Sequence, residues 1–344
     1  MLDERKLRIL QAIIDDYTTS AVPVGSRTIT RKYDMGVSPA TIRNEMSDLE
    51  DLGYLVQPHV SAGRIPSGKA FRLYADMLLE HSDELCRLNR ETEQMDNFFR
   101  LHINRPENAD EEAAKALSQL TRYTSLVLMP GQLTLRIATM QLVPMPRGSA
   151  LLVIVTDGGI VRDAVIHVSS SLDADGLYTI SRMLTERFRG MTLREVQEAL
   201  SGYVMLSGAD TRVLSGIAEL TNRMQMQAAV DSLSVGGAHN ILNYPEYSDV
   251  LKARAFMTVM EAKEKLISVM KASPEGFAVL IGDEIGLPET RECALLTAQY
   301  RLSAEHNGVL GLLGPIRMPY KNMIKALNAC AGRMTNLFYP GNDI

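Results

Sequence analysis

Residues Ser38 to Gly53 read SPATIRNEMSDLEDLG, and this stretch predicts a helix with both of its ends marked. Serine is a favoured N-cap, and proline is tolerated at the first helical position because its missing N–H would have no partner there. Gly53 stands where glycine commonly ends a helix in the left-handed conformation. On a helical wheel the apolar side chains share one face, which we expect to be buried: Ile42, Met46, Leu49 and Leu52.

The opposite face of this predicted helix suits the major groove of DNA. It carries small and hydrogen-bonding side chains: Ala40, Arg43, Asn44 and Ser47. Arginine can bind guanine O6 and N7, asparagine can pair with adenine, and alanine or serine lets a helix approach closely. Acidic side chains oppose this reading, but we expect Glu45 and Glu50 on the flanks and Asp51 in the last turn. Recognition helices read bases with their N-terminal half. The alternative is a surface helix of a protein–protein module.

The neighbouring residues predict the rest of a DNA-binding unit. A helix over 5–20 has an apolar stripe, and Ser26 is expected to cap a second, short helix. Residues 54–56 predict a strand, and 57–67, with Pro58 and Pro66, predict a stiff loop. This order is that of a winged helix-turn-helix. Residues 27–72 contain seven Lys and Arg against five Asp and Glu, a mild basic surplus.

The predicted loop is expected to act as the wing, reaching a phosphate or the minor groove. We expect Arg43 and Asn44 at base edges, and Arg64 and Lys69 at phosphates. The complete predicted set of DNA-contacting residues is Ser38, Ala40, Thr41, Arg43, Asn44, Ser47, His59, Ser61, Arg64 and Lys69.

Composition leaves the function open and bounds the size. A chain of 344 residues is long enough for two or three domains, and 46% hydrophobic with 22% charged residues is ordinary for a soluble protein. The net charge of −5 describes the average field only, and DNA binding needs one basic face. Cys86, Cys293 and Cys330 form no CxxC pair, which favours buried thiols in a reducing compartment. Neither a signal peptide nor a membrane span is predicted, so we expect a cytoplasmic protein.

Motifs of enzyme chemistry are not found in the sequence. The six histidines have no HxxxH or HExxH spacing, and neither a GxSxG elbow nor a Walker-type loop occurs. Gly308, Gly311 and Gly314 indicate close backbone packing or a turn. Asp283-Glu284 is interpreted as a solvated loop, because no acid or base stands at a useful spacing from it. We therefore predict no enzyme activity, no metal and no cofactor.

The remainder of the chain predicts an α+β architecture. A polar spacer helix is expected over 70–102 and a final helix over 320–338. Apolar runs predict antiparallel strands over 126–129, 135–143, 150–156, 161–168, 278–281, 294–302 and 309–313. Helical spacing covers 173–189, 192–200, 210–234 and 246–271, with a capping box at Thr192 and Glu195. Strands, then helices, then strands again predict one domain interrupted by a helical insertion.

Several strings in this chain closely resemble the HrcA family of heat-inducible transcription repressors. They are PVGSRT at 23–28, SPATIRNEM at 38–46, LEDLG at 49–53, QPH at 57–59, SAGRIP at 61–66, GGAHNIL at 236–242, YPEY at 244–247 and GPIRMPY at 314–320. The likeness covers essentially the whole chain. It departs from the family pattern at Ile285, where asparagine is usual, and at Ile316, where threonine is usual.

The resemblance implies a division into five segments. It implies a winged helix at 1–75, a linker helix at 76–104, a GAF-like domain at 105–202 and 269–344, and an inserted dimerising domain at 203–268. It further implies a homodimer that represses heat-shock chaperone operons at an inverted-repeat operator, with the GroEL chaperonin maintaining the active repressor. An alternative is a transcription regulator gated by a small molecule in the GAF-like domain.

Overall fold

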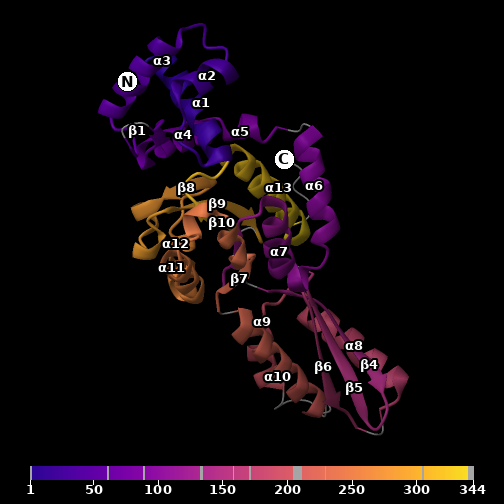
Figure 1. Cartoon of the computed structure of the whole chain (residues 1–344). Helices are drawn as coiled ribbons and strands as arrows, with labels where there is room; N and C mark the ends of the chain where they lie inside the picture. The colour runs from indigo at the N-terminus through magenta and orange to yellow at the C-terminus, as the bar shows by residue number, and fades with distance from the viewer. Residues whose placement is uncertain are drawn as a thin grey trace.

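The structure is a computed structural model with α+β architecture, drawn whole in Figure 1. The residues that it describes are 2–59, 62–87, 90–131, 135–157, 159–169, 172–203, 211–228, 230–303 and 306–339.

The N-terminal unit packs three helices against a short hairpin. The helices are α1 (Glu4–Ser20), α2 (Ser26–Lys32) and α3 (Pro39–Asp51), and the hairpin pairs β1 (Leu55–Val56) with β2 (Ile65–Pro66) antiparallel. Ile9 and Ile13 of α1, Ile29 of α2 and Ile42 and Leu49 of α3 are fully buried in one core. The helix α4 (Gly68–Glu80) then leads to the sheet domain (Figure 1).

The predicted ends of α3 are confirmed. The Ser38 hydroxyl accepts the N–H of Thr41 at 3.2 Å, and Gly53 has a φ of 77°. Two neighbouring predictions are wrong. The residue that caps α2 is Gly25, without a side-chain hydrogen bond, and Ser26 is the first helical residue. Leu52 is 47% exposed because it is the C-cap of α3, beyond the last turn that packs on the core.

A five-stranded antiparallel sheet forms the middle of the molecule. Its strand order is β7-β3-β10-β9-β8. The strands are β3 (Thr124–Met129), β7 (Ser232–Gly236), β8 (Phe277–Ile281), β9 (Cys293–Arg301) and β10 (Asn307–Pro315). Successive side chains of β10 point to opposite faces of the sheet, so they pack into two different cores. Leu310 and Leu312 pack with α7 (Ala109–Thr121) and α13 (Tyr320–Phe338), whereas Val309 and Leu313 pack with α11 (Val250–Glu261) and α12 (Lys263–Lys271).

The predicted spacer helix over 70–102 is broken into three helices. They are α4, α5 (Ser82–Leu85) and α6 (Arg90–His102). The last is no polar spacer, because Phe99 is fully buried in the core shared with α7 and α13. The predicted helix over 246–271 is likewise divided at Ala262 into α11 and α12.

Two strands were missed by the sequence prediction, namely β2, which lies within the predicted loop over 57–67, and β7. Helical spacing over 210–234 predicted a single helix, but α10 (Thr211–Ala228) ends first and β7 follows. The residues of β7 pair with β3, from Ser125 opposite Gly236 to Met129 opposite Ser232. Long-range pairing of this kind overrides a local helical pattern.

A separate unit lies between β3 and β7 and extends away from the sheet (Figure 1). It has a three-stranded antiparallel sheet of β4 (Ile137–Met145), β5 (Ser149–Thr156) and β6 (Val161–His167). Three helices pack on it, namely α8 (Ala174–Phe188), α9 (Leu193–Tyr203) and α10. The capping box at α9 is confirmed, since Glu195 accepts the N–H of Thr192 at 2.7 Å. The unit has its own core, which includes Ile137, Leu152, Ile154, Val196 and Ile217.

The expected boundaries of the insertion are therefore wrong. The chain leaves the five-stranded sheet after β3 and returns to it at β7, so the inserted unit spans about 135–228 rather than 203–268. The segments α11 and α12 belong to the sheet domain, because Phe256, Leu266 and Met270 are buried against its strands. The strands β4 to β6 belong to the insertion and not to the first part of the sheet domain.

Candidate nucleic-acid interface

The helix α3 presents one polar face to solvent. Ala40, Arg43, Asn44 and Ser47 are exposed on it, and Thr41 is half-buried beside the exposed cap Ser38. Within the described part of the chain, the side chains of Arg43 and Asn44 have neither a hydrogen bond nor an ion pair. Their donors and acceptors are thus available to a ligand, as the sequence predicts for this face.

Two acidic residues of α3, Glu45 and Asp48, form ion pairs with cations of α1. Glu45 is 8% exposed, and its carboxylate lies 3.0 Å from Arg5 Nε and 2.8 Å from Lys6 Nζ. Lys6 also pairs with Asp48 at 3.1 Å. These two carboxylates raise the pKa of Lys6 above its ordinary value. Cations of α1 therefore balance the charges of Glu45 and Asp48, whereas Asp51 is exposed and has no ion pair among the described residues.

The hairpin is fixed to the rest of the unit through Arg64. Its backbone N–H and C=O each bond to Val24 at 2.8 Å, and its Nε lies 2.8 Å from Glu50 of α3. The preceding Gly63 is required by this close approach, because a Cβ there would lie 2.5 Å from the Val24 backbone. The side chain of Arg64 is only 18% exposed, so in this structure it ties the hairpin to α3.

Lys69 contacts the C-terminal end of α3, where Glu50 also lies. Its ammonium donates to the carbonyl oxygen of Leu52 at 2.9 Å and lies 4.4 Å from the centre of the Tyr54 ring. A cation at this end of a helix is favourable, because the last carbonyls are unpaired and the helix dipole is negative there. The residue remains exposed to solvent.

The tip of the loop holds the remaining predicted residues. His59 is exposed, and the Gln57 amide closes the loop by donating to the carbonyl of Ala62 at 3.1 Å. Ser61 lies outside the described residues. Two exposed cations that the sequence reading left out, Arg27 and Arg31, lie one turn apart on α2. Their spacing of four residues was the available signal.

Other groups singled out in the sequence have structural surroundings. Cys293 and Cys330 are buried and Cys86 is half-buried, and burial raises the pKa of Cys86 and of Cys293 to about 11. Their thiols are therefore mostly protonated at neutral pH, which lowers their reactivity as nucleophiles. Across the described ranges, no three histidine, cysteine or acidic side chains converge as metal ligands would. The described helices include none with the length and hydropathy of a membrane span.

Both side chains of the acidic pair at 283–284 are exposed, as predicted, but the pair lies in the short 3-10 helix Gly282–Ile285 and not in a loop. Glu284 accepts the N–H of Ile281 at 2.9 Å and pairs with Arg72 of α4 at 3.0 Å, so it ties the sheet domain to the N-terminal unit. The glycines of β10 are confirmed as sites of close packing. A Cβ at Gly308 would lie 2.2 Å from the Tyr300 ring.

Comparison with known proteins places this architecture in a family. The model of the HrcA protein C-terminal domain matches residues 108–324. A protein of Acetivibrio thermocellus is 35% identical over 337 residues, which are 97% of this chain and 95% of that protein. One of Pelotomaculum thermopropionicum is 38% identical over 331 residues, 95% of this chain and 94% of that protein. Both are named heat-inducible transcription repressor HrcA.

A solved structure has the same fold. It is a crystal structure of a protein described as hypothetical, 26% identical, with a TM-score of 0.71 over 98% of this chain and 99% of that one. The family model covers more than half of the chain, and the two relatives extend the likeness to the N-terminal unit. The chain therefore belongs to the HrcA family, whose curated members are named heat-inducible transcription repressors.

Proposed function

We propose that this protein is a transcriptional repressor that binds operator DNA with its N-terminal unit. In this proposal α1 to α3 and the β1–β2 hairpin act as a winged helix-turn-helix, and α3 enters the major groove. The observation that carries the proposal is the exposed face of α3, where Arg43 and Asn44 have no partner among the described residues. An unpaired arginine and asparagine one residue apart on a recognition helix can read guanine and adenine.

The hairpin is proposed as the wing. Its anchoring by Arg64 and Gly63 supports this role, because a wing must keep a fixed position beside the recognition helix. His59 and Ser61 are proposed to reach the DNA backbone from the loop, and Lys69 from the start of α4. Arg64 is proposed to contact a phosphate, and its ion pair with Glu50 gives it a structural role as well.

A homodimer is proposed, because an inverted-repeat operator demands two-fold symmetry. The outer face of the β4–β6 sheet is the surface that supports it. Val143, Leu151 and Val165 lie in register across this face, and Val143 and Val165 are 45% and 58% exposed. A second copy of the chain would cover these side chains. We therefore propose an interface on β4 to β6 instead of the helical faces of 203–268.

The dimer proposal is tested by sedimentation at micromolar concentration. Val165→Asp should convert the dimer to monomer, because two carboxylates would be buried at the interface without partners. Thr179→Asp, on the solvent side of α8, is the matched control and should leave a dimer. A Val165→Asp protein that remains fully dimeric would place the interface elsewhere.

The proposed targets are heat-shock chaperone operons, with the GroEL chaperonin maintaining the active repressor. The sheet domain, proposed to be GAF-like, supports a need for folding assistance. Its strands β3 and β7 pair across about 100 intervening residues, such as Leu128 with Leu233. Long-range strand pairing forms slowly and leaves apolar surface exposed until it is complete.

Gel shifts after a mild heat step should show lost operator binding that returns with GroEL and ATP. Full recovery on simple cooling, with no chaperonin effect, would remove this part of the proposal.

A second candidate is a regulator gated by a small molecule. A groove of about 670 Å³ beside β7 favours it, because the cations Lys115, Arg122 and Lys263 outnumber the single carboxylate Glu111 in its lining. A panel of small anions in a thermal-shift assay distinguishes the candidates. A reproducible rise in melting temperature that also changes operator affinity would support the gated regulator.

DNA recognition itself is tested with an inverted-repeat operator and a scrambled duplex in gel shifts. The Arg43→Ala/Asn44→Ala protein should lose its preference for the operator and keep its folding. Arg254→Ala, an exposed arginine on α11, is the matched control. Equal affinity of the unaltered protein for operator and scrambled DNA would refute the proposed function.

A further inference from the structure

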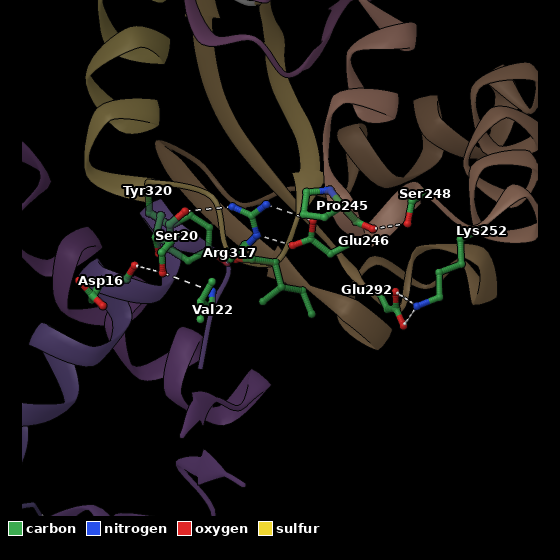
Figure 2. A network of polar contacts seen from close by, with 12 residues as sticks. Asp16, Ser20, Val22, Pro245, Glu246, Ser248, Lys252, Glu292, Arg317 and Tyr320 are labelled. Carbon is green, nitrogen blue, oxygen red and sulfur yellow. Dashed lines mark hydrogen bonds and ion pairs between the residues drawn. The ribbon is translucent and has the colours of Figure 1, made fainter. Parts of the chain in front are cut away.

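Arg317 lies buried where the N-terminal unit meets the sheet domain. It is 8% exposed and follows β10 in the segment GPIRMPY. Its Nη2 donates to the Glu246 carboxylate at 3.1 Å, and its Nε bonds to the other carboxylate oxygen. Its Nη1 donates to the carbonyl oxygen of Thr18 at 3.0 Å. Figure 2 shows the guanidinium between the end of α1 and Glu246. One side chain therefore joins three segments that are distant in sequence.

The end of α1 has a carbonyl that needs this donor. The N–H of Val22, which would close the next helical turn on Thr18, bonds instead to the Ser20 hydroxyl at 3.2 Å. The helix ends at Ala21 in the left-handed conformation. The last carbonyls of a helix have no intrahelical partner, and the dipole there favours a cation. The Arg317 guanidinium supplies both a hydrogen-bond donor for the Thr18 carbonyl and a positive charge at this end of α1.

Glu246 is itself held within the sheet domain. It belongs to the short turn Pro245–Tyr247, and the preceding Tyr244 stacks on Tyr123 with ring centres 5.0 Å apart. The Arg317 guanidinium lies 5.7 Å from the centre of the Tyr244 ring. Arginine presents a rigid planar fork, so a bidentate carboxylate on one side fixes the direction of its remaining N–H groups. Glu246 of the sheet domain therefore directs Nη1 of Arg317 toward the Thr18 carbonyl of α1.

The other end of α1 is bound to α3. Glu45 of α3 pairs with Lys6 and Arg5, at 2.8 and 3.0 Å. A helix of 17 residues is about 25 Å long, and it moves as a rod. A change of angle at Thr18 is therefore carried to the face of α3 that holds Arg43 and Asn44.

A second contact between the two domains lies on α4. Arg72 pairs with Glu284 at 3.0 Å and donates to the Val279 carbonyl, and Phe71 packs against Tyr320 with ring centres 6.2 Å apart. One contact alone leaves a rigid body free to rotate about it. Two contacts on different helices define an orientation.

We propose that Arg317 and Glu246 are positioning residues that set the orientation of α3 relative to the sheet domain. They act through α1, with the α4 contact as the pivot. The inference deepens the proposed function and rests on it, because a dimer must present its two recognition helices about 34–36 Å apart to match two half-sites. It assigns a role to two family strings, YPEY and GPIRMPY, that contact no DNA in the proposal.

The orientation is measured directly by pulsed EPR. Spin labels are placed by Asp34→Cys, beside α3, and Glu289→Cys, on the sheet domain, in a Cys86→Ser background. Both label positions are exposed, and excess unlabelled chain removes distances between protomers. The unaltered pair should give one narrow distance. Arg317→Met should at least double the width of the distribution, and Arg317→Lys, which keeps the charge without the fork, should broaden it less.

The matched control is Lys252→Met. Lys252 pairs with Glu292 at 2.6 Å close to Glu246, but this ion pair does not reach α1 (Figure 2). It should leave the distance distribution unchanged. Unchanged widths in both Arg317 variants would overturn the proposal. So would equal broadening in the control.

DNA binding separates this inference from the proposed function. Affinity for a full inverted repeat should fall about tenfold in Arg317→Met if the competent orientation falls to roughly a tenth of the population. Affinity for a single half-site should not change, since the face of α3 is intact. Equal losses on both duplexes, or tighter binding to the full repeat, would overturn the positioning role. If the unaltered protein binds neither duplex, the proposed function fails and the EPR result still decides the orientation.

Discussion

Arg43 on α3 and Arg317 at the domain junction are the same residue type in opposite situations. Arg43 is exposed and has no partner among the described residues, whereas Arg317 is buried and donates to Glu246 and Thr18. A buried guanidinium requires partners, because an uncompensated buried charge costs several kcal/mol. An exposed one is stable in water and is free to bind a ligand. The partners of an arginine, and not its residue type, therefore distinguish a ligand-binding arginine from a structural one.

The largest effect is expected when the buried arginine loses its carboxylate. Glu246→Ala should lower the free energy of unfolding by about 3 kcal/mol, because it leaves the Arg317 charge buried and unpaired. Denaturant titration measures this loss. Adding Arg317→Met to the same chain should recover part of the stability, since the orphaned charge is then gone. A double variant less stable than Glu246→Ala would show that the unpaired charge of Arg317 is not the cause of the lost stability.

Replacement of the exposed Arg43 is expected to weaken DNA binding more than it lowers stability. Arg43→Ala should leave the free energy of unfolding within about 0.5 kcal/mol and weaken operator binding by about 1–3 kcal/mol. It should also relax specificity at one operator position, because a base contact is lost. Gel shifts with single base-pair variants of the operator measure this. Equal losses on operator and random DNA would reject the base-reading role.

Arg64 is intermediate between the exposed Arg43 and the buried Arg317. It pairs with Glu50 and is largely covered, so Arg64→Ala should cost up to about 1 kcal/mol in the free energy of unfolding. Operator and random DNA should be weakened similarly, and the salt dependence of binding should flatten, as expected for a phosphate contact. An unchanged salt dependence would leave Arg64 with only its structural role. Arg254→Ala, at an exposed position of α11, is the control.

The smallest effect is expected at the helix cap beside the proposed interface. Ser38→Ala removes the acceptor for the N–H of Thr41 and should cost about 1 kcal/mol of stability. Ser38→Gly should cost only a few tenths, because glycine is also tolerated at the N-cap. Thermal unfolding followed by circular dichroism measures both. Equal destabilisation by the two variants would show that the Ser38 hydroxyl stabilises the protein by something other than helix capping.

Local chemistry was enough to predict most of the elements. Ser38-Pro39 and Gly53 mark the ends of α3 because caps and left-handed glycines depend on the few residues beside them. The same holds for the capping box at Thr192 and Glu195. The final helix over 320–338 was predicted with the bounds that it has. The exposed face of α3 follows from helical periodicity alone.

Contacts between distant residues could not be predicted in this way. The strand β7 has a helical local pattern and becomes a strand by pairing with β3, and that pairing also sets the boundaries of the inserted unit. Arg64 finds Glu50 within the N-terminal unit, and Arg317 finds Thr18 across about 300 residues of chain. In one sequence nothing distinguishes the unpaired charge of Arg43 from the paired charges of Arg64 and Arg317. The physical reason is that pairing depends on which surfaces the packed cores bring together, and a local pattern holds no information about that.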